Sequence, residues 1–324
     1  MKAEAVARKM IKGANTVIDT LVLIVVILLV AFAAYALWDS SQIYGAADKT
    51  EYAVYKPTEA KGGKGFHELQ AINPEVIGWL TVYGTNIDYP VTQGPDNMKY
   101  INTDAEGNYS LSGAIFLDSD NSRDFSDFNN ILYGHHMEKK EMFGEIGSFE
   151  KETTFDTHPY GNLYHDGKDY GIEFFALVYT DAYDYELFTA NVKGAERQAY
   201  LDDLRAKAMQ HRDLAVTPDD HIILLSTCSS DTTNGRDILV GKITDETYID
   251  STVATHPAVI ELPGVDSRGG FLEDIPLWLL LLVLILAALL VLCVLVRRRR
   301  RRKGAKAAGA TDKTENNEEG CGLR

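Results

Sequence analysis

The sequence predicts a mainly β domain with attached helices, flanked by two transmembrane helices. Seven short apolar runs, separated by turn residues, lie between residues 77 and 243, and this spacing is typical of a mainly antiparallel barrel or sandwich. Two uncharged or nearly uncharged apolar stretches, residues 17–38 and 275–296, are each long enough to cross a bilayer as a helix. At 324 residues, one domain with appendages fits the length best.

The cations beside the two apolar stretches predict their orientation. Lys2, Arg8, Lys9 and Lys12 precede the first stretch, and a run of arginines and one lysine at 297–303 follows the second. Because cytoplasmic flanks carry an excess of Lys and Arg, both termini (1–16 and 297–324) are expected in the cytoplasm and the middle of the chain outside.

A cleaved secretory signal is the alternative for the first stretch. Ala31-Phe-Ala33 and Ala34-Tyr-Ala36 resemble the small-residue sites at which signal peptides are cut. The length of the apolar run favours an uncleaved anchor. In either case the second stretch would keep the domain at the membrane.

Charge is divided unevenly along the chain, whose formal net charge is -15. The two basic ends carry about +2 and about +6, which leaves about -23 for the middle. Such acidity argues against nucleic acid as a partner of the outer domain. The basic run at 297–303 has the composition that contacts anionic membrane lipid, although a topology signal is the favoured interpretation.

The outer region begins with a polar stretch. Residues 39–64 are interpreted as a stalk, 65–250 as the folded domain and 251–274 as a second stalk. Phe66, Leu69 and Ile72 have approximate helical spacing and predict a short helix that ends before Asn73-Pro74.

Strands and two helical insertions make up the rest of this domain. The apolar stripes at 143–149 and 195–211 predict the helical insertions. The expected strands are 77–83, 87–92, 113–117, 130–133, 171–179, 221–227 and 238–243.

Three residues with the chemistry of thiol acyl transfer lie at predicted strand ends. Cys228 has no second cysteine between the apolar stretches, so it is either an inert packing residue or a nucleophile. His135 has the chemistry to protonate a leaving amine, and Arg236 to stabilise negative charge on an oxyanion. Taken singly, a buried thiol, a turn histidine and a surface arginine are the favoured interpretations of these residues.

Several motifs around these residues resemble the sortases. Leu225-Ser-Thr-Cys228 followed by Arg236 is similar to the sortase signature, although Leu224 stands where a threonine is usual. Tyr133-Gly-His135 with His136 and Met137 resembles the class B form of the histidine motif. The resemblance continues through Asn73-Pro-Glu-Val-Ile-Gly-Trp79, Ile87-Asp-Tyr-Pro90 and Phe125-Ser-Asp-Phe-Asn129, and covers about residues 66–243.

This resemblance implies a closed eight-stranded β-barrel with N-terminal helices and an inserted helix before the cysteine strand. It also implies a cysteine transpeptidase with Cys228 as nucleophile, His135 as general acid and base, and Arg236 as stabiliser of the transition state. His136 would point to the other face and be structural. Some class B sortases carry an acidic residue two positions after the cysteine, where this chain has Ser230 followed by Asp231. A Cys-His-Arg set is therefore expected.

The expected substrate contacts lie beside this set. Ser226 and Thr227 belong to the cysteine strand, and Tyr185 belongs to an aromatic group, Tyr179, Tyr183, Tyr185 and Phe188, that lines a peptide groove or packs. No metal or other cofactor is expected. The segment from Asp118 opens like a calcium loop but has an arginine at its sixth position and an asparagine at its twelfth.

The resemblance implies a Gram-positive cell-surface enzyme whose partners are secreted proteins with a C-terminal sorting motif. Two amine acceptors stay open, a peptidoglycan precursor in cell-wall anchoring and a pilin lysine in pilus assembly. The second apolar stretch resembles pilus-building sortases, whereas no Asp-Pro-aromatic lid precedes the barrel. A membrane-bound cysteine peptidase and a non-enzymatic binding module on a sortase-like barrel are the alternatives.

Overall fold

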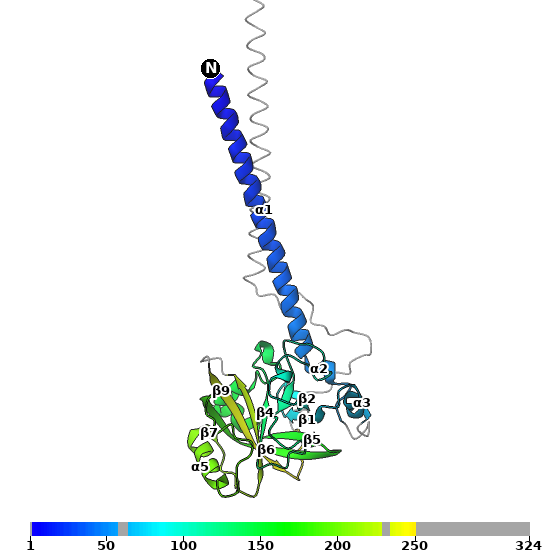
Figure 1. Ribbon diagram of the computed structural model, residues 1–324. Helices are drawn as coiled ribbons and strands as arrows, with labels where there is room; N and C mark the ends of the chain where they lie inside the picture. Colours follow the sequence, from blue (N-terminus) through cyan, green and yellow to red (C-terminus); the bar gives the residue numbers. More distant parts are fainter. Residues whose placement is uncertain (1, 58–63, 229–233, 251–324) are drawn as a thin grey trace, which may run out of the picture. The chain divides into compact units, whose positions relative to one another are not determined.

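The structure, a computed structural model, describes residues 2–57, 64–228 and 234–250 (Figure 1). These residues belong to two units that divide between Ser41 and Gln42. The second predicted membrane helix, the second stalk and the C-terminal tail (residues 251–324) lie outside the described residues.

The described residues of the first unit form the greater part of the long helix α1 (Lys2–Ala47). Its most apolar 18-residue window has a mean hydropathy of 3.0, and by length and composition the helix is able to cross a membrane. The hydroxyls of Thr16 and Thr20 donate to the carbonyls of Lys12 and Thr16, so the helix itself satisfies these polar groups. The predicted first stretch is therefore helical throughout.

The expected stalk at 39–64 differs from what the structure contains. Helix α1 continues to Ala47, and a short helix α2 (Lys49–Tyr52) follows. Ala47 and Tyr52 are both buried against β2: the Tyr89 hydroxyl donates to the Ala47 carbonyl at 2.9 Å, and the Tyr52 and Tyr89 rings meet edge to face. The packing of Tyr52 on Tyr89 holds this part of the chain on the barrel. A contact between residues so far apart in the sequence cannot be predicted from the polar composition of residues 39–64.

Eight strands close into a barrel, and a ninth adds to its side. The hydrogen-bonded order is β5-β1-β2-β3-β4-β8-β9-β6-β7, and β5 also pairs with β6, which closes the ring and leaves β7 on the edge of β6. Two pairs are parallel, β2–β3 and β4–β8, and the others are antiparallel. The strands are β1 (Val76–Val82), β2 (Asp88–Thr92), β3 (Ile115–Leu117), β4 (Asn129–Tyr133), β5 (Tyr160–His165), β6 (Lys168–Asp181), β7 (Ala208–His211), β8 (His221–Cys228) and β9 (Gly235–Thr244).

All seven predicted strands are present, and β5 and β7 were missed. Neither missed strand shows an apolar run: β5 contains Gly161, Asn162 and His165, and two of the four residues of β7 are polar. The predicted helix at 195–211 is too long, because α5 (Arg197–Lys207) ends before residues that pair with β6 as β7. Pairing with β6 overrides the helical pattern there.

The remaining helices are short. The predicted helix before Asn73 is α3 (Lys64–Ile72). The insertion at 143–149 forms the 3-10 helix η4 (Ile146–Glu150), followed by α4 (Glu152–Thr157), with Phe143, Ile146 and Phe149 fully buried. Two further 3-10 helices are η2 (Lys99–Ile101) and η3 (Glu138–Lys140).

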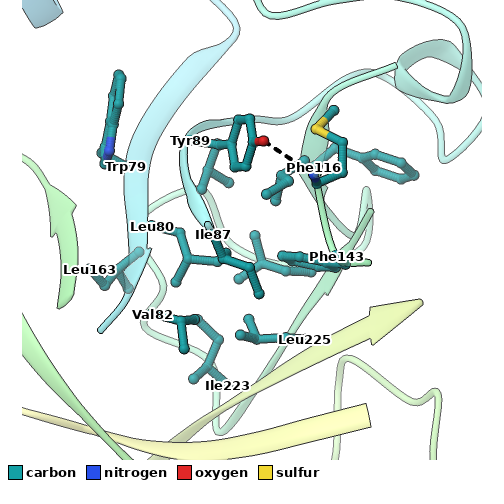
Figure 2. Close-up of a cluster of buried hydrophobic side chains, with 14 of the residues drawn as sticks. Trp79, Leu80, Val82, Ile87, Tyr89, Phe116, Phe143, Leu163, Ile223 and Leu225 are labelled. Atoms are coloured by element: carbon teal, nitrogen blue, oxygen red, sulfur yellow. Dashed lines mark hydrogen bonds between the residues drawn. The ribbon is translucent and has the colours of Figure 1, made fainter. Parts of the chain in front are cut away.

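Strand β8 is buried on both faces, which explains its continuous apolar run. Ile223 and Leu225 lie in the barrel core with Leu80, Val82 and Leu163 (Figure 2). Successive strand residues face opposite ways, so the intervening Ile222 and Leu224 belong to a second cluster that includes Leu201 and Leu204 of α5. The two layers fix the position of the cysteine strand from both sides.

Helix α5 is also held by charges. The Lys207 ammonium lies 2.6 Å from an Asp184 carboxylate oxygen and 2.7 Å from one of Asp203, and the Thr180 hydroxyl donates to Asp184. Burial alone would raise the pKa of Asp184, but the hydrogen bonds from Lys207 and Thr180 outweigh it and hold the pKa below its ordinary value. These contacts tie the last turn of α5 to the loop after β6.

We expect Lys207→Met to lower the free energy of unfolding by about 1 kcal/mol at pH 7, because it removes the main donor to Asp184. A carboxyl group whose pKa is lower in the folded protein than in the unfolded chain stabilises the fold at pH values above its pKa in the unfolded chain, which is near 4. This stabilisation is lost as the pH falls through the pKa of the group in the folded protein. The difference between the wild type and the variant should therefore shrink below about pH 4. Urea denaturation of the full chain in detergent measures it.

Lys193→Met is the matched control, because Lys193 is an exposed lysine of the same insertion and forms no ion pair within the described ranges. It should change stability by less than about 0.5 kcal/mol. A Lys207→Met deficit that stays constant from pH 7 down to pH 2 would contradict the role of Asp184.

Candidate active site

Strand pairing brings the three predicted catalytic residues to one end of the barrel. Cys228 is the last residue of β8 and lies opposite Arg236 at the start of β9. Because β4 runs parallel to β8, with Tyr133 beside Ser226, the residues after Tyr133 pass next to the end of the cysteine strand. The Gly134 amide donates to the Ser226 carbonyl at 3.2 Å and places His135 there.

A cavity of about 750 Å³ opens at this end of the barrel. Its lining includes all six residues expected from the sequence for catalysis and substrate binding. The lining residues are Asn97, Met98, Ile101, Ala114, Phe116, Asp118, Asp120, Tyr133, Gly134, His135, Ala182, Tyr185, Phe188, Ser226, Thr227, Cys228 and Arg236.

Cys228 is exposed and is the one free cysteine in the described part of the chain. Exposure favours a reactive thiol over a packing residue, since inert free cysteines are usually buried. Ser230 and Asp231, the residues considered for a carboxylate-assisted triad, lie outside the described residues.

The two adjacent histidines differ in their surroundings. The His135 ring is partly buried, lines the cavity, and has Nε2 2.9 Å from the carbonyl oxygen of Ile101. His136 does not line the cavity, and its Nδ1 is buried without a partner among the described residues. Gly134 is required before them because a Cβ would lie 2.7 Å from the ring of Phe143.

Arg236 is partly buried and donates to the carbonyl of Gly235. Within the described ranges no carboxylate lies at ion-pair distance from its guanidinium. Among the described residues its charge is therefore unpaired, and an unpaired guanidinium at a cavity suits the stabilisation of an oxyanion.

The hydroxyls of Ser226 and Thr227 are the unsatisfied polar groups of this site. The two residues are 1% and 2% exposed, and neither side-chain oxygen has a hydrogen-bond partner in the described structure. Buried hydroxyls without partners are costly, so a polar group of a bound ligand would be stabilised here. The predicted contact Tyr185 is 74% exposed and lies at the edge of the cavity.

The aromatic group named from the sequence divides in two. Tyr185 and Phe188 line the cavity, whereas Tyr179 and Tyr183 are absent from its lining. Tyr183 is instead 64% exposed, with its ring 6.3 Å from that of Tyr185.

Sequence reasoning missed one wall of the cavity, which is built around Asp118. Its carboxylate is buried and accepts hydrogen bonds from the Tyr133 hydroxyl and the Asn97 amide, both at 2.9 Å, and from the backbone of Asp120. Burial and Asp118 together raise the pKa of Tyr133, so its hydroxyl stays protonated and donates. The acidic segment that resembles a calcium loop therefore anchors the strand that leads to His135.

A closed barrel with a cysteine, a histidine and an arginine at one cavity is the arrangement that the resemblance to the sortases implies. No family model matches the chain. Sortase B of Staphylococcus aureus is 34% identical over 184 residues, which are 55% of this chain and 74% of that protein. Sortase B of Listeria monocytogenes is 31% identical over 178 residues, which are 54% and 72%.

Solved structures agree with these relatives. A Streptococcus pyogenes class B sortase involved in pilus biogenesis is 40% identical with a TM-score of 0.52, over 55% of this chain and 97% of that one. A sortase B complexed with triglycine is 26% identical with a TM-score of 0.53, over 64% and 97%. The chain belongs to the class B sortase family.

We expect Asp118→Asn to lower the free energy of unfolding by about 2 kcal/mol. Both carboxylate oxygens accept hydrogen bonds, so either orientation of the amide turns an NH₂ group toward a donor. Urea denaturation measures the loss. The exposed Asp120→Asn is the matched control and should change stability by less than about 0.5 kcal/mol. Equal effects of the two substitutions would contradict this account of the cavity wall.

Proposed function

We propose that this class B sortase is anchored in the membrane and cleaves a C-terminal sorting signal outside the cell, transferring the acyl group to an amine. The convergence of Cys228, His135 and Arg236 on one cavity at the end of β8 carries the proposal. Their chemistry is complementary: a nucleophile, a proton carrier and a fixed positive charge.

In the first half-reaction the Cys228 thiolate attacks the carbonyl carbon of the scissile peptide bond. Arg236 donates hydrogen bonds to the oxygen that becomes negative. When the carbon–nitrogen bond breaks, the imidazolium of His135 gives a proton to the departing amine, and a thioester with Cys228 remains. An incoming amine then attacks the thioester, returns its proton to His135 and releases the Cys228 thiolate.

Ser226, Thr227 and Tyr185 are the proposed substrate contacts. Both residues line the cavity, and their buried hydroxyls lack partners in the described structure, which suits polar groups of a peptide backbone. The exposed Tyr185 ring at the edge of the cavity offers an apolar face to a peptide side chain. The sorting signal would therefore lie along the end of β8.

The acceptor is an amine, either a lysine of a pilin or an amino group of a peptidoglycan precursor. The relative involved in pilus biogenesis has a higher identity, 40%, than the Staphylococcus aureus protein, 34%, and this favours a pilin lysine. A triglycine complex of a sortase B with 26% identity makes a glycine amine a relevant probe of the acceptor position.

We further propose that the chain crosses the membrane twice, with both termini in the cytoplasm. The apolar stretch 17–38 forms the first crossing within α1, and 275–296, outside the described residues, forms the second. The basic residues at 297–303 would then contact anionic lipid on the cytoplasmic side.

Substitution of the proposed catalytic residues tests the reaction. Cys228→Ala should abolish cleavage of a sorting peptide, and His135→Gln and Arg236→Lys should each lower kcat/KM by about a hundredfold or more. His136→Gln, one residue away and outside the cavity, is the control and should stay within about threefold of the wild type. Peptide cleavage by the full chain in detergent, with and without triglycine or a pilin lysine peptide, is the measurement.

The same assay separates the alternatives. Transpeptidation gives a peptide–amine product in the presence of an acceptor, whereas a peptidase gives hydrolysis under every acceptor condition. A binding module predicts that Cys228→Ala leaves surface-protein display on cells unchanged. Either result would exclude the proposed transfer.

Reporter fusions test the topology. Green fluorescent protein fused after residue 324 should fluoresce, and alkaline phosphatase fused after residue 250 of a truncated chain should be active, because the first site is cytoplasmic and the second outside. The opposite pattern at residue 324 would rule out the second crossing.

A further inference from the structure

We infer that the main-chain carbonyl of Ile101 is the positioning group for His135, and that Gly113 is the residue that allows the carbonyl to lie there. The inference rests on the proposed catalytic role of His135. It assigns to a backbone oxygen the task that a carboxylate performs in a Ser-His-Asp triad.

The contact fixes which ring nitrogen carries a proton. His135 Nε2 lies 2.9 Å from the Ile101 oxygen, and a carbonyl oxygen only accepts hydrogen bonds. Nε2 must therefore be the donor in both the neutral ring and the imidazolium. Nδ1 is then the nitrogen that exchanges a proton with the leaving or incoming amine, while the Nε2 proton stays in place.

The end of η2 explains why this carbonyl is available. The last carbonyls of a helix have no partner within it and need one from elsewhere. The neighbouring carbonyls are used by the returning loop: Tyr100 accepts from the Ala114 amide at 3.0 Å, and Asn102 accepts from the Ser110 amide at 3.1 Å. The carbonyl between them, that of Ile101, is the one that accepts from His135.

A buried side chain holds η2 in position. Tyr100 is fully buried, and its hydroxyl donates to a Glu75 carboxylate oxygen at 2.7 Å and accepts from the Asn73 amide at 2.9 Å. The adjacent Ile101 carbonyl is therefore attached to the barrel and does not depend on a free loop. This rigidity is what a positioning group requires.

Gly113 allows the chain that returns after η2 to lie close to the backbone of η2. It has a φ of +60°, and a Cβ at this position would lie 2.7 Å from the Ile101 oxygen and closer still to the Tyr100 oxygen, both of them backbone atoms. Backbone cannot turn aside as a flexible side chain does. A methyl group at residue 113 would thus move the Ile101 carbonyl away from His135.

Gly107 is the matched control within the same loop. It also has a positive φ, +91°, so alanine there brings a comparable backbone strain. A Cβ at Gly107 has no neighbour within 4 Å. Gly113→Ala and Gly107→Ala therefore differ in the contact with η2.

The experiment uses the full chain in detergent micelles, labelled with ¹⁵N-histidine. Long-range ¹H–¹⁵N spectra at pH 9, where imidazoles are neutral, report the tautomer of each of the eight histidines, and His135→Gln identifies the signal of His135. The wild type should show the Nε2–H tautomer at His135. Gly113→Ala should give a mixture of tautomers and lower kcat for peptide cleavage about tenfold, with KM changed less than about twofold.

Gly107→Ala should keep the wild-type tautomer and kcat. An Nδ1–H tautomer in the wild type, or a wild-type kcat in a folded Gly113→Ala, would overturn the inference; if Gly113→Ala does not fold, the wild-type tautomer decides alone. These results are distinct from failure of the proposed function, which would appear as full activity of His135→Gln.

Discussion

The pairing of β8 with two different neighbours is the constraint on which the site depends. Parallel pairing with β4 brings the chain after Tyr133 beside the end of β8, and antiparallel pairing with β9 places Arg236 opposite Cys228. Neither pairing alone assembles the three groups. Strand β8 is also buried on both faces, so a slip of one residue would move its apolar side chains between two filled layers. The same packing that stabilises the barrel therefore fixes the register of the proposed catalytic residues.

Sequence reasoning located what depends on local pattern and missed what depends on contacts between distant segments. The apolar runs predicted seven strands, and the six residues predicted from the signature motifs and the aromatic group all line one cavity. Strands β5 and β7 carry polar residues and are recognisable only by their partners. Asp118 and the Ile101 carbonyl act through hydrogen bonds to residues 15 and 34 positions away. A backbone oxygen leaves no side-chain signal, and the nearest clue in the sequence is a glycine at residue 113.

The junction between α1 and the barrel shows how burial couples to protonation. The Tyr89 hydroxyl lies within hydrogen-bond distance of the Ala47 carbonyl and of a Glu141 oxygen, and it accepts from the Met142 amide. A phenol has one proton, so both oxygen contacts form together only when Glu141 carries a proton of its own. Burial raises the pKa of Glu141, which favours that state. Because the pKa of Glu141 is higher in the folded protein than in the unfolded chain, this contact stabilises the fold fully at pH values below the pKa in the unfolded chain. The stabilisation is lost as the pH rises through the pKa in the folded protein.

A neutral positioning group has an electrostatic consequence for the proposed mechanism. A carboxylate beside His135 would also attract Arg236, and an ion pair would consume the charge that the oxyanion needs. The Ile101 carbonyl orients the ring without adding a negative charge to the cavity. The carboxylate that does lie in the wall, Asp118, has both oxygens occupied by the donors Tyr133, Asn97 and the Asp120 amide. Within the described ranges Arg236 thus has no anionic partner, so in the proposed mechanism its charge acts on the substrate oxygen.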